Sequence, residues 1–141
     1  MRLLLDTSAY SAFKRGHAQL VAALRQAVLI VLTPIVLGEL LSGFARGSRE
    51  ARNRAELERF LQSPRVKILP VGQETAERFA VIYRSLRESG TPIPSNDMWI
   101  AASAMEHGLR VLTTDAHFRR VPMILTHWID VTEGAADGKV P

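Results

Sequence analysis

Four acidic residues stand where a carboxylate could take part in chemistry, and two of them follow predicted buried strands. Asp6 comes directly after the aliphatic run 2–5, and Asp115 comes just after the run 110–113. In a parallel sheet both side chains project from the carboxyl edge, where α/β proteins bind their ligands. The two aspartates are therefore expected to share one site.

The other two acids lie in helical segments with apolar neighbours. Asp97 is in the first turn of a helix behind the polar pair 95–96, and it continues an apolar stripe with spacings of three and four. Glu39 lies little more than one turn into a helix that begins at Thr33 and Pro34. A carboxylate in such an apolar segment costs free energy unless it has a partner. The sequence places no obvious cationic partner beside these acids.

Gathered in one pocket, Asp6, Glu39, Asp97 and Asp115 would repel one another, and some of their pKa values would rise. A divalent cation relieves this repulsion, and ligation by oxygen alone favours Mg²⁺ or Mn²⁺ over zinc. Because Mg²⁺ keeps several waters when it binds a protein, it leaves room for a substrate phosphate. The acids therefore predict hydrolysis of a phosphodiester, in which water activated by the ion attacks the phosphorus.

Each acid also has an ordinary structural explanation. Asp6, Asp97 and Asp115 could each cap the start of a helix or turn. Glu39 could pack its aliphatic stem while its carboxylate reaches water. Four independent coincidences at one sheet edge are a poor explanation, but spacing alone does not identify a nuclease.

The elements that must position these acids alternate between short aliphatic runs and amphipathic helical segments, which favours an α/β fold. Thr33 is a good N-cap and Pro34 fits the first helical position, so a helix starts there. The charge-rich segment 48–61 should be a mostly solvated helix. One domain is expected over 1–132, with a flexible tail over 133–141. We predict strands over 2–5, 28–32, 66–69, 110–113 and 123–126, and helices over 9–14, 17–27, 35–44, 48–61, 73–89 and 97–107.

Composition excludes several classes of protein. With no cysteine, disulfide frameworks, thiolate zinc sites and cysteine nucleophiles are ruled out. The four histidines show no metal-binding spacing, although His117, two residues after Asp115, could contact RNA. The net charge of +4 suits a nucleic-acid partner, but arginine-rich composition explains it equally well. No apolar stretch suits a signal peptide or a membrane span, so a cytoplasmic protein without membrane contact is expected.

Four sequence blocks, taken in order, resemble the PIN-domain nucleases, and above all the VapC toxins of type II toxin–antitoxin modules. The blocks are LLLDTSAY, TPIVLGELL, IPSNDMWIAASAMEHG and VLTTDAHF, and the likeness extends from Arg2 to about Trp128. The resemblance implies a three-layer α/β/α sandwich around a central, mostly parallel sheet. It also implies cleavage of RNA that depends on Mg²⁺, with Mn²⁺ as a substitute.

The resemblance also assigns residues and partners. Asp6 and Asp97 would be the usual metal ligands, Asp115 would join them directly or through water, and Glu39 would help to hold the metal or its water. Family membership implies a homodimer and a small antitoxin that wraps the toxin. Hydroxyl groups that orient the carboxylates would come from Thr7, Ser8 and Thr113 or Thr114.

Three functions remain open at this point. The first is an endoribonuclease toxin restrained by an antitoxin. The second is a stand-alone RNA-processing nuclease of the same fold, or a catalytically weak module that binds RNA. The third is a phosphatase with Asp6 as nucleophile, which is disfavoured because no second aspartate follows two residues later.

Overall fold

Five strands form one parallel sheet in the computed structural model, which describes residues 1–132 of the chain. Their order across the sheet is β3-β2-β1-β4-β5, and every neighbouring pair is parallel. The expectation of a mostly parallel sheet is confirmed, with β1 at the centre. The strands are β1 (Arg2–Leu5), β2 (Leu29–Leu32), β3 (Val66–Ile68), β4 (Arg110–Thr113) and β5 (Leu125–Trp128).

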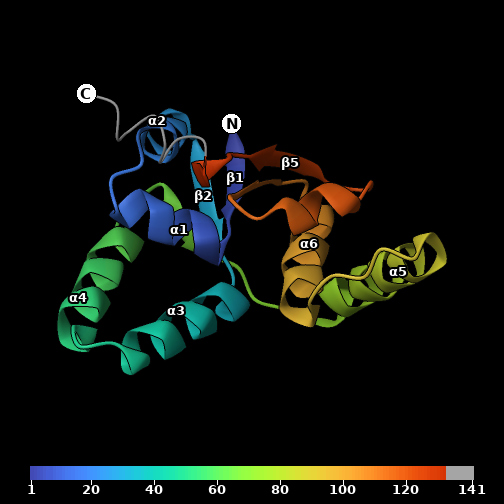
Figure 1. Cartoon of the computed structure of the whole chain (residues 1–141), viewed down its shortest axis with the longest axis horizontal. Coiled ribbons are helices and arrows are strands. Elements are labelled where there is room, and N and C mark those ends of the chain that lie inside the picture. Colours follow the sequence, from blue (N-terminus) through green and yellow to red (C-terminus); the bar gives the residue numbers. More distant parts are fainter. Residues whose placement is uncertain (133–141) are drawn as a thin grey trace.

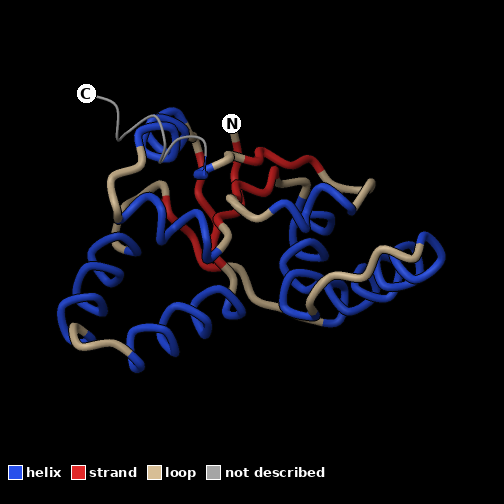
Figure 2. Tube along the Cα trace, viewed as in Figure 1, coloured by secondary structure: helices blue, strands red, loops and turns tan. Residues whose placement is uncertain are grey.

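Helices cover both sides of this sheet, so the fold is the expected three-layer α/β/α sandwich (Figure 1, Figure 2). The helices are α1 (Thr7–Lys14), α2 (Ala18–Gln26), α3 (Pro34–Arg46), α4 (Glu50–Leu61), α5 (Gln73–Ser89) and α6 (Ser95–His107), and a 3-10 helix, η1 (Ala116–Arg120), precedes β5. Figure 1 shows α5 and α6 on one side, with α1, α3 and α4 on the other. Helices α5 and α6 pack against each other, as do α3 and α4.

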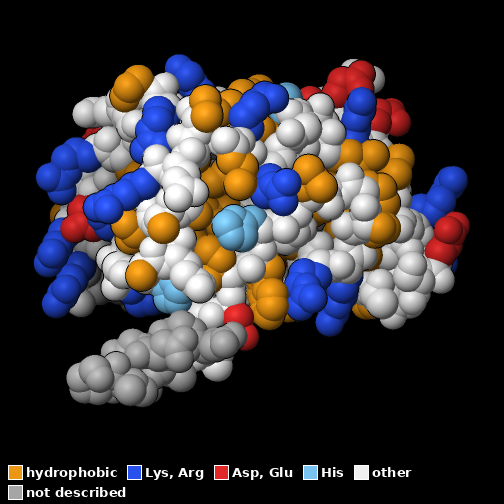
Figure 3. Space-filling view, turned by 90° about the horizontal axis from the view of Figure 1, so that it is seen from above, with side chains coloured by type: hydrophobic (Ala, Val, Ile, Leu, Met, Phe, Trp, Pro, Cys, Tyr) orange, Lys and Arg blue, Asp and Glu red, His pale blue; other side chains and the backbone are white. Residues whose placement is uncertain are grey.

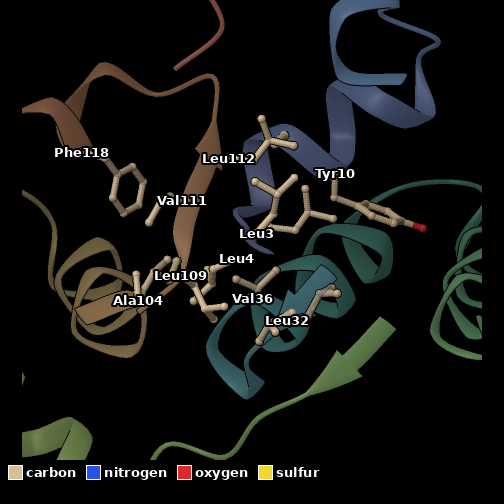
Figure 4. Close-up of a cluster of buried hydrophobic side chains, with 14 of the residues drawn as sticks. Leu3, Leu4, Tyr10, Leu32, Val36, Ala104, Leu109, Val111, Leu112 and Phe118 are labelled. Atoms are coloured by element: carbon tan, nitrogen blue, oxygen red, sulfur yellow. The ribbon is translucent and has the colours of Figure 1, made fainter. Parts of the chain in front are cut away.

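Burial from both sides explains why the three central strands, β2, β1 and β4, are largely continuous aliphatic runs rather than alternating ones. Residues 3–5 of β1 are fully buried, and so are Val111 and Leu112 of β4. Figure 4 shows side chains from both strands in one cluster, with Phe118 at one side and Tyr10 at the other. Because such interiors are close-packed, the carboxyl ends of β1 and β4 are held in fixed positions.

Local sequence decides where two of the helices lie. At the start of α3 the Val36 N–H donates to Thr33 Oγ1 at 3.5 Å, and Pro34 takes the first helical position. The predicted start of this helix is confirmed. Helix α4 buries Leu57 and leaves most of its other residues in contact with solvent, as its charge-rich sequence predicted.

Two helices begin earlier than predicted. Helix α1 starts at Thr7 rather than at 9, because Asp6 itself occupies the N-cap position. Helix α6 starts at Ser95 rather than at 97, because Pro94 occupies that position. Asp97 therefore still lies in the first turn of its helix.

The last strand was predicted at the wrong place. Strand β5 covers Leu125–Trp128 and pairs with Arg110–Thr113, instead of covering 123–126. Met123 and Ile124 pack against the core from a loop. They are apolar because they are partly buried, although they do not belong to a strand.

Two further expectations concern the ends of the domain and the membrane. The tail predicted over 133–141 lies outside the described residues, so it stays a prediction, together with the domain boundary at 132. Within residues 1–132, none of the helices has the length and apolar character needed to cross a bilayer.

Candidate active site

Asp6 and Asp115 lie at the same edge of the sheet, because β1 and β4 are neighbouring parallel strands. The Asp6 N–H donates to the Leu112 carbonyl at 3.1 Å, which extends the ladder by one residue. Helix α3 contacts both α1 and α6 at this edge, and it lies below the strands in the view of Figure 1. Glu39 on α3 and Asp97 on α6 therefore join the two aspartates that follow the strands.

Asp6 is the most deeply placed of the four acids, with 4% of its surface exposed. The hydroxyls of Ser8 and Thr113 both donate to its Oδ2 atom, each at 2.7 Å. Burial raises the pKa of Asp6 above its usual value, and the nearby charge of Glu39 adds to this rise, while the two hydroxyl donors oppose it. The hydroxyls therefore stabilise the ionised form of a carboxylate that burial penalises.

The same two hydroxyls tie the start of α1 to the end of β4. Ser8 Oγ lies 3.3 Å from Thr113 Oγ1 and accepts the Thr114 N–H at 3.1 Å. Thr113 Oγ1 also accepts the Asp115 N–H at 2.9 Å. Of the two threonines offered by the sequence, Thr113 supplies the hydroxyl that reaches Asp6, and Thr114 contributes its backbone N–H.

Glu39 is held from two neighbouring helices. Thr7 Oγ1 of α1 donates to Glu39 Oε1 at 2.7 Å, and Asn96 Nδ2 of α6 donates to Glu39 Oε2 at 3.4 Å. The glutamate is half-buried, so it does not simply extend into water from the surface of α3. The predicted role of Thr7 as an orienting group agrees with this contact.

Asp97 and Asp115 meet through a histidine. His117 Nδ1 lies 3.2 Å from Asp97 Oδ2 and 3.1 Å from Asp115 Oδ1. Burial raises the pKa of Asp97 to about 6, with the hydrogen bond to His117 opposing the rise and the charges of Asp6 and Asp115 adding to it. Asp115 Oδ1 also accepts the His117 N–H at 2.9 Å, so the capping explanation is correct for Asp115 as well.

Electrostatic repulsion links the four carboxylates, although only Asp97 and Asp115, together with His117, have ligand atoms that all lie within 4.8 Å of one another. Glu39 acts on Asp6, and both Asp6 and Asp115 act on Asp97. Among residues 1–132 no lysine or arginine forms an ion pair with any of these acids, whose one ion-pair partner there is His117. Carboxylate oxygens that carry excess negative charge are the ligands that hard divalent cations prefer, so the donor set fits such an ion.

His117 was not predicted to lie within this group, because no metal-binding spacing relates the histidines to one another. The available signal was its position two residues after Asp115, in a turn that the aspartate caps. Such a short turn brings the ring back over the carboxylate, and Phe118, which is fully buried, anchors it.

A cleft of about 560 Å³ opens beside Glu39, along α3. Gly38, Ser42 and Arg46 line it at helical spacing, and Asn96 lines it from α6. The Arg46 side chain extends back along its own helix, because its Nη2 atom lies 3.8 Å from where a Cβ on Gly43 would be. The cleft therefore leads from the acidic site to a guanidinium group.

The opposite end of the sheet, where the strands begin, has a different surface. Seen from that side, it carries scattered basic side chains between apolar ones, with carboxylates toward the margins (Figure 3).

Comparison with known proteins agrees with this geometry. The model of the PIN domain family matches residues 3–123. Ribonuclease VapC1 of Rickettsia felis is 33% identical over 124 residues, which cover 86% of this chain and 91% of that protein.

Two solved structures extend the comparison. VapBC-5 from Mycobacterium tuberculosis, a member of the VapBC family of toxin–antitoxin systems, is 29% identical with a TM-score of 0.73, covering 92% of this chain and 100% of that chain. VapBC2 from Rickettsia felis, bound to a DNA fragment from its promoter, has a TM-score of 0.81 at 23% identity, with the same coverage, and shows the fold alone. A family model that matches most of the chain and a relative similar over nearly its whole length establish that this protein belongs to the PIN-domain family, among the VapC ribonucleases.

Proposed function

We propose that this protein is an endoribonuclease that depends on Mg²⁺, with Mn²⁺ as a substitute, and that it acts as the toxin of a type II toxin–antitoxin module. The observation that carries the proposal is the convergence of Asp6, Glu39, Asp97 and Asp115 at one sheet edge, where they repel one another. The VapC relatives support a ribonuclease reaction.

In this proposal Asp6, Asp97 and Asp115 hold the divalent cation. A cation bound there would offset the charge that builds on the phosphate and lower the pKa of the attacking water. The hydroxyls of Ser8 and Thr113 donate to Asp6, which favours its ionised form and fixes the direction of its carboxylate. Thr7 holds Glu39 so that its carboxylate can orient the water and receive its proton.

The RNA strand is proposed to enter along the cleft beside α3. Gly38 and Ser42 leave the wall of this cleft free of large side chains, and Arg46 offers a guanidinium that suits a phosphate. Asn96, whose side chain reaches Glu39, sits where the cleft meets the acids. A backbone contact of this kind positions RNA without selecting its sequence.

Two protein partners belong to the proposal. One is a small cognate antitoxin, because VapBC toxin–antitoxin structures cover most of this chain. The other is a second copy of the chain. Helix α5 supports a dimer because it exposes Tyr83 at the rim of an apolar cavity of about 310 Å³, which Leu86, Ile93 and Met98 also line. The proposed location is the cytoplasm, where RNA and such partners occur.

The decisive experiment measures cleavage of RNA by purified protein with EDTA, Mg²⁺ or Mn²⁺. Asp6→Asn and Asp97→Asn should abolish both cleavage and toxicity on expression. Glu58→Gln, on the exposed face of α4, removes a carboxylate elsewhere and should leave both intact. Toxicity retained by either aspartate variant would end the proposal, and RNA binding without cation-dependent cleavage would favour the RNA-binding alternative. A stand-alone RNA-processing enzyme would cleave RNA but have no antitoxin that binds and inhibits it.

A further inference from the structure

His117 is held inside the acidic site by the turn that carries it. Asp115 Oδ1 caps η1 by accepting the His117 N–H, and the fully buried Phe118 fixes the next position of the same turn. These two contacts fix the backbone of His117 beside the acids, and its imidazole contacts the carboxylates of both Asp97 and Asp115. Its side chain is 37% exposed, so its other nitrogen, Nε2, can reach water.

Three potential ligand atoms point at one another in this corner of the site. Asp97 Oδ2, Asp115 Oδ1 and His117 Nδ1 lie within 4.8 Å of one another. The nitrogen stands 3.2 Å from the first oxygen and 3.1 Å from the second. Neighbouring ligands of an octahedral ion with bonds of about 2.1 Å are about 3.0 Å apart. The two nitrogen–oxygen spacings are close to that edge length, so His117 Nδ1 is placed to share a cation with each carboxylate.

We propose that His117 Nδ1 is a ligand of the cation, beside Asp97 and Asp115, and that it makes the site prefer a first-row transition-metal ion such as Mn²⁺ or Co²⁺ over Mg²⁺. This inference rests on the cation site of the proposed function. Imidazole nitrogen suits transition metals, whereas Mg²⁺ selects oxygen ligands. Acids alone would favour Mg²⁺, so the histidine changes the preference that the sequence predicts.

For this role the imidazole needs the tautomer with its proton on Nε2, which leaves the Nδ1 lone pair directed at the cation. Because the ring is partly exposed, its Nε2–H can donate a hydrogen bond to water. Asp115 has two contacts with His117. Its carboxylate lies beside the Nδ1 atom, and it also accepts the His117 N–H and so caps the turn that carries the imidazole.

The test uses untagged full-length protein loaded with Mn²⁺ and electron spin-echo spectroscopy, which detects a directly bonded ¹⁴N nucleus. Wild-type protein should show nitrogen modulation, and His117→Ala should lose it. The matched control is His107→Ala, which removes a histidine at the end of α6 and should keep the modulation. Mn²⁺ bound to wild-type protein without nitrogen modulation would overturn the inference.

Calorimetric titration with Mn²⁺ and with Mg²⁺ supplies a second measurement. His117→Ala should weaken Mn²⁺ binding about tenfold or more and Mg²⁺ binding much less. Equal weakening of both ions would show that the histidine only positions the carboxylates, which would also overturn the inference. Thermal unfolding of each variant confirms that it is folded.

The two proposals fail in different ways. Nitrogen modulation in a protein that never cleaves RNA would leave the ligand assignment standing and end the proposed function. Cation-dependent cleavage without nitrogen modulation would support the proposed function and overturn the ligand assignment.

Discussion

The hydroxyl of Thr113 donates to Asp6 Oδ2 at 2.7 Å, between neighbouring strands and across 107 positions of the sequence. The same hydroxyl accepts the Asp115 N–H, so one buried side chain contacts two acids of the site. Thr113 is fully buried, so water does not compete with its hydroxyl for these two hydrogen bonds. Here its hydroxyl donates to a buried carboxylate and opposes the rise in the pKa of Asp6 that burial causes.

Thr113→Val keeps the shape of this side chain and removes both hydrogen bonds. We expect a loss of about 1–3 kcal/mol in the free energy of unfolding, because buried polar partners are left unsatisfied. Cation affinity should also fall, because the pKa of Asp6 rises further. Urea unfolding and calorimetry measure the two effects. Thr113→Ser keeps the hydroxyl and should be affected less in cation binding; equal affinities for wild type and the valine variant would contradict the prediction.

Asp97→Asn should stabilise the protein without cations at pH 8. Because the native protein binds the Asp97 proton more tightly than the unfolded chain, stability falls as pH rises from 3.8 to about 6 and stays lowered above that. The shift corresponds to at most about 3 kcal/mol. Unfolding in EDTA should show the gain at pH 8 and little of it near pH 4. A variant that is less stable than wild type at pH 8 would contradict this prediction. The control Glu58→Gln retains Asp97, so its stability should fall with rising pH as that of the wild type does.

Glu39→Gln should separate catalysis from cation binding. We expect cleavage to slow by about 10²-fold or more, because the neutral amide cannot receive a proton from water. The affinity for the cation should change far less, since the three aspartates remain. Single-turnover cleavage of RNA and calorimetry measure these quantities. Thr7→Val, which removes the hydrogen bond that directs Glu39 Oε1, should slow cleavage by less, and Thr7→Ser less still. Full activity in Glu39→Gln would exclude the proposed role.

Arg46→Ala should weaken RNA binding at every RNA sequence tested. One lost phosphate contact should reduce the dependence of log affinity on log salt by about 1. Binding of fluorescent RNA at several salt concentrations measures this slope. Arg54→Ala on α4 removes the same charge away from the cleft, so it serves as the control. Identical slopes in the two variants would show that the cleft does not hold the RNA backbone.

Tyr83→Arg should convert a dimer into a monomer if α5 forms the proposed contact between copies. Light scattering during size-exclusion chromatography gives the mass of each variant. Val28→Arg places the same charge at another exposed apolar position and should leave the dimer unchanged. A monomeric wild-type protein would refute the proposed dimer outright.

The positions of Asp6 and Glu39 could be predicted because local sequence determines them. A strand buried on both faces is a continuous aliphatic run, so its first polar residue marks the carboxyl edge. Thr33 and Pro34 likewise define the start of α3 and therefore the turn that carries Glu39. The family match confirms the fold that these patterns predicted, while the roles of individual acids still await experiment.

Features that depend on contacts between distant segments could not be predicted in the same way. Which of Thr113 and Thr114 presents its hydroxyl to Asp6 depends on the register of β4 against β1. The approach of His117 to Asp97 depends on how Phe118 packs beneath the turn. Strand β5 was misplaced because apolar residues in a loop and apolar residues in an edge strand look alike in sequence.

The capping contact from Asp115 to the His117 backbone has a practical consequence for mutagenesis. Removing that carboxylate deletes one negative group and also releases the loop that displays the imidazole, so a single substitution produces two lesions. Substitution of Asp115 alone would therefore overstate the contribution of its carboxylate to cation binding and cleavage. Only a paired design, with changes at 115 and 117 made separately and together, can divide the contribution between them.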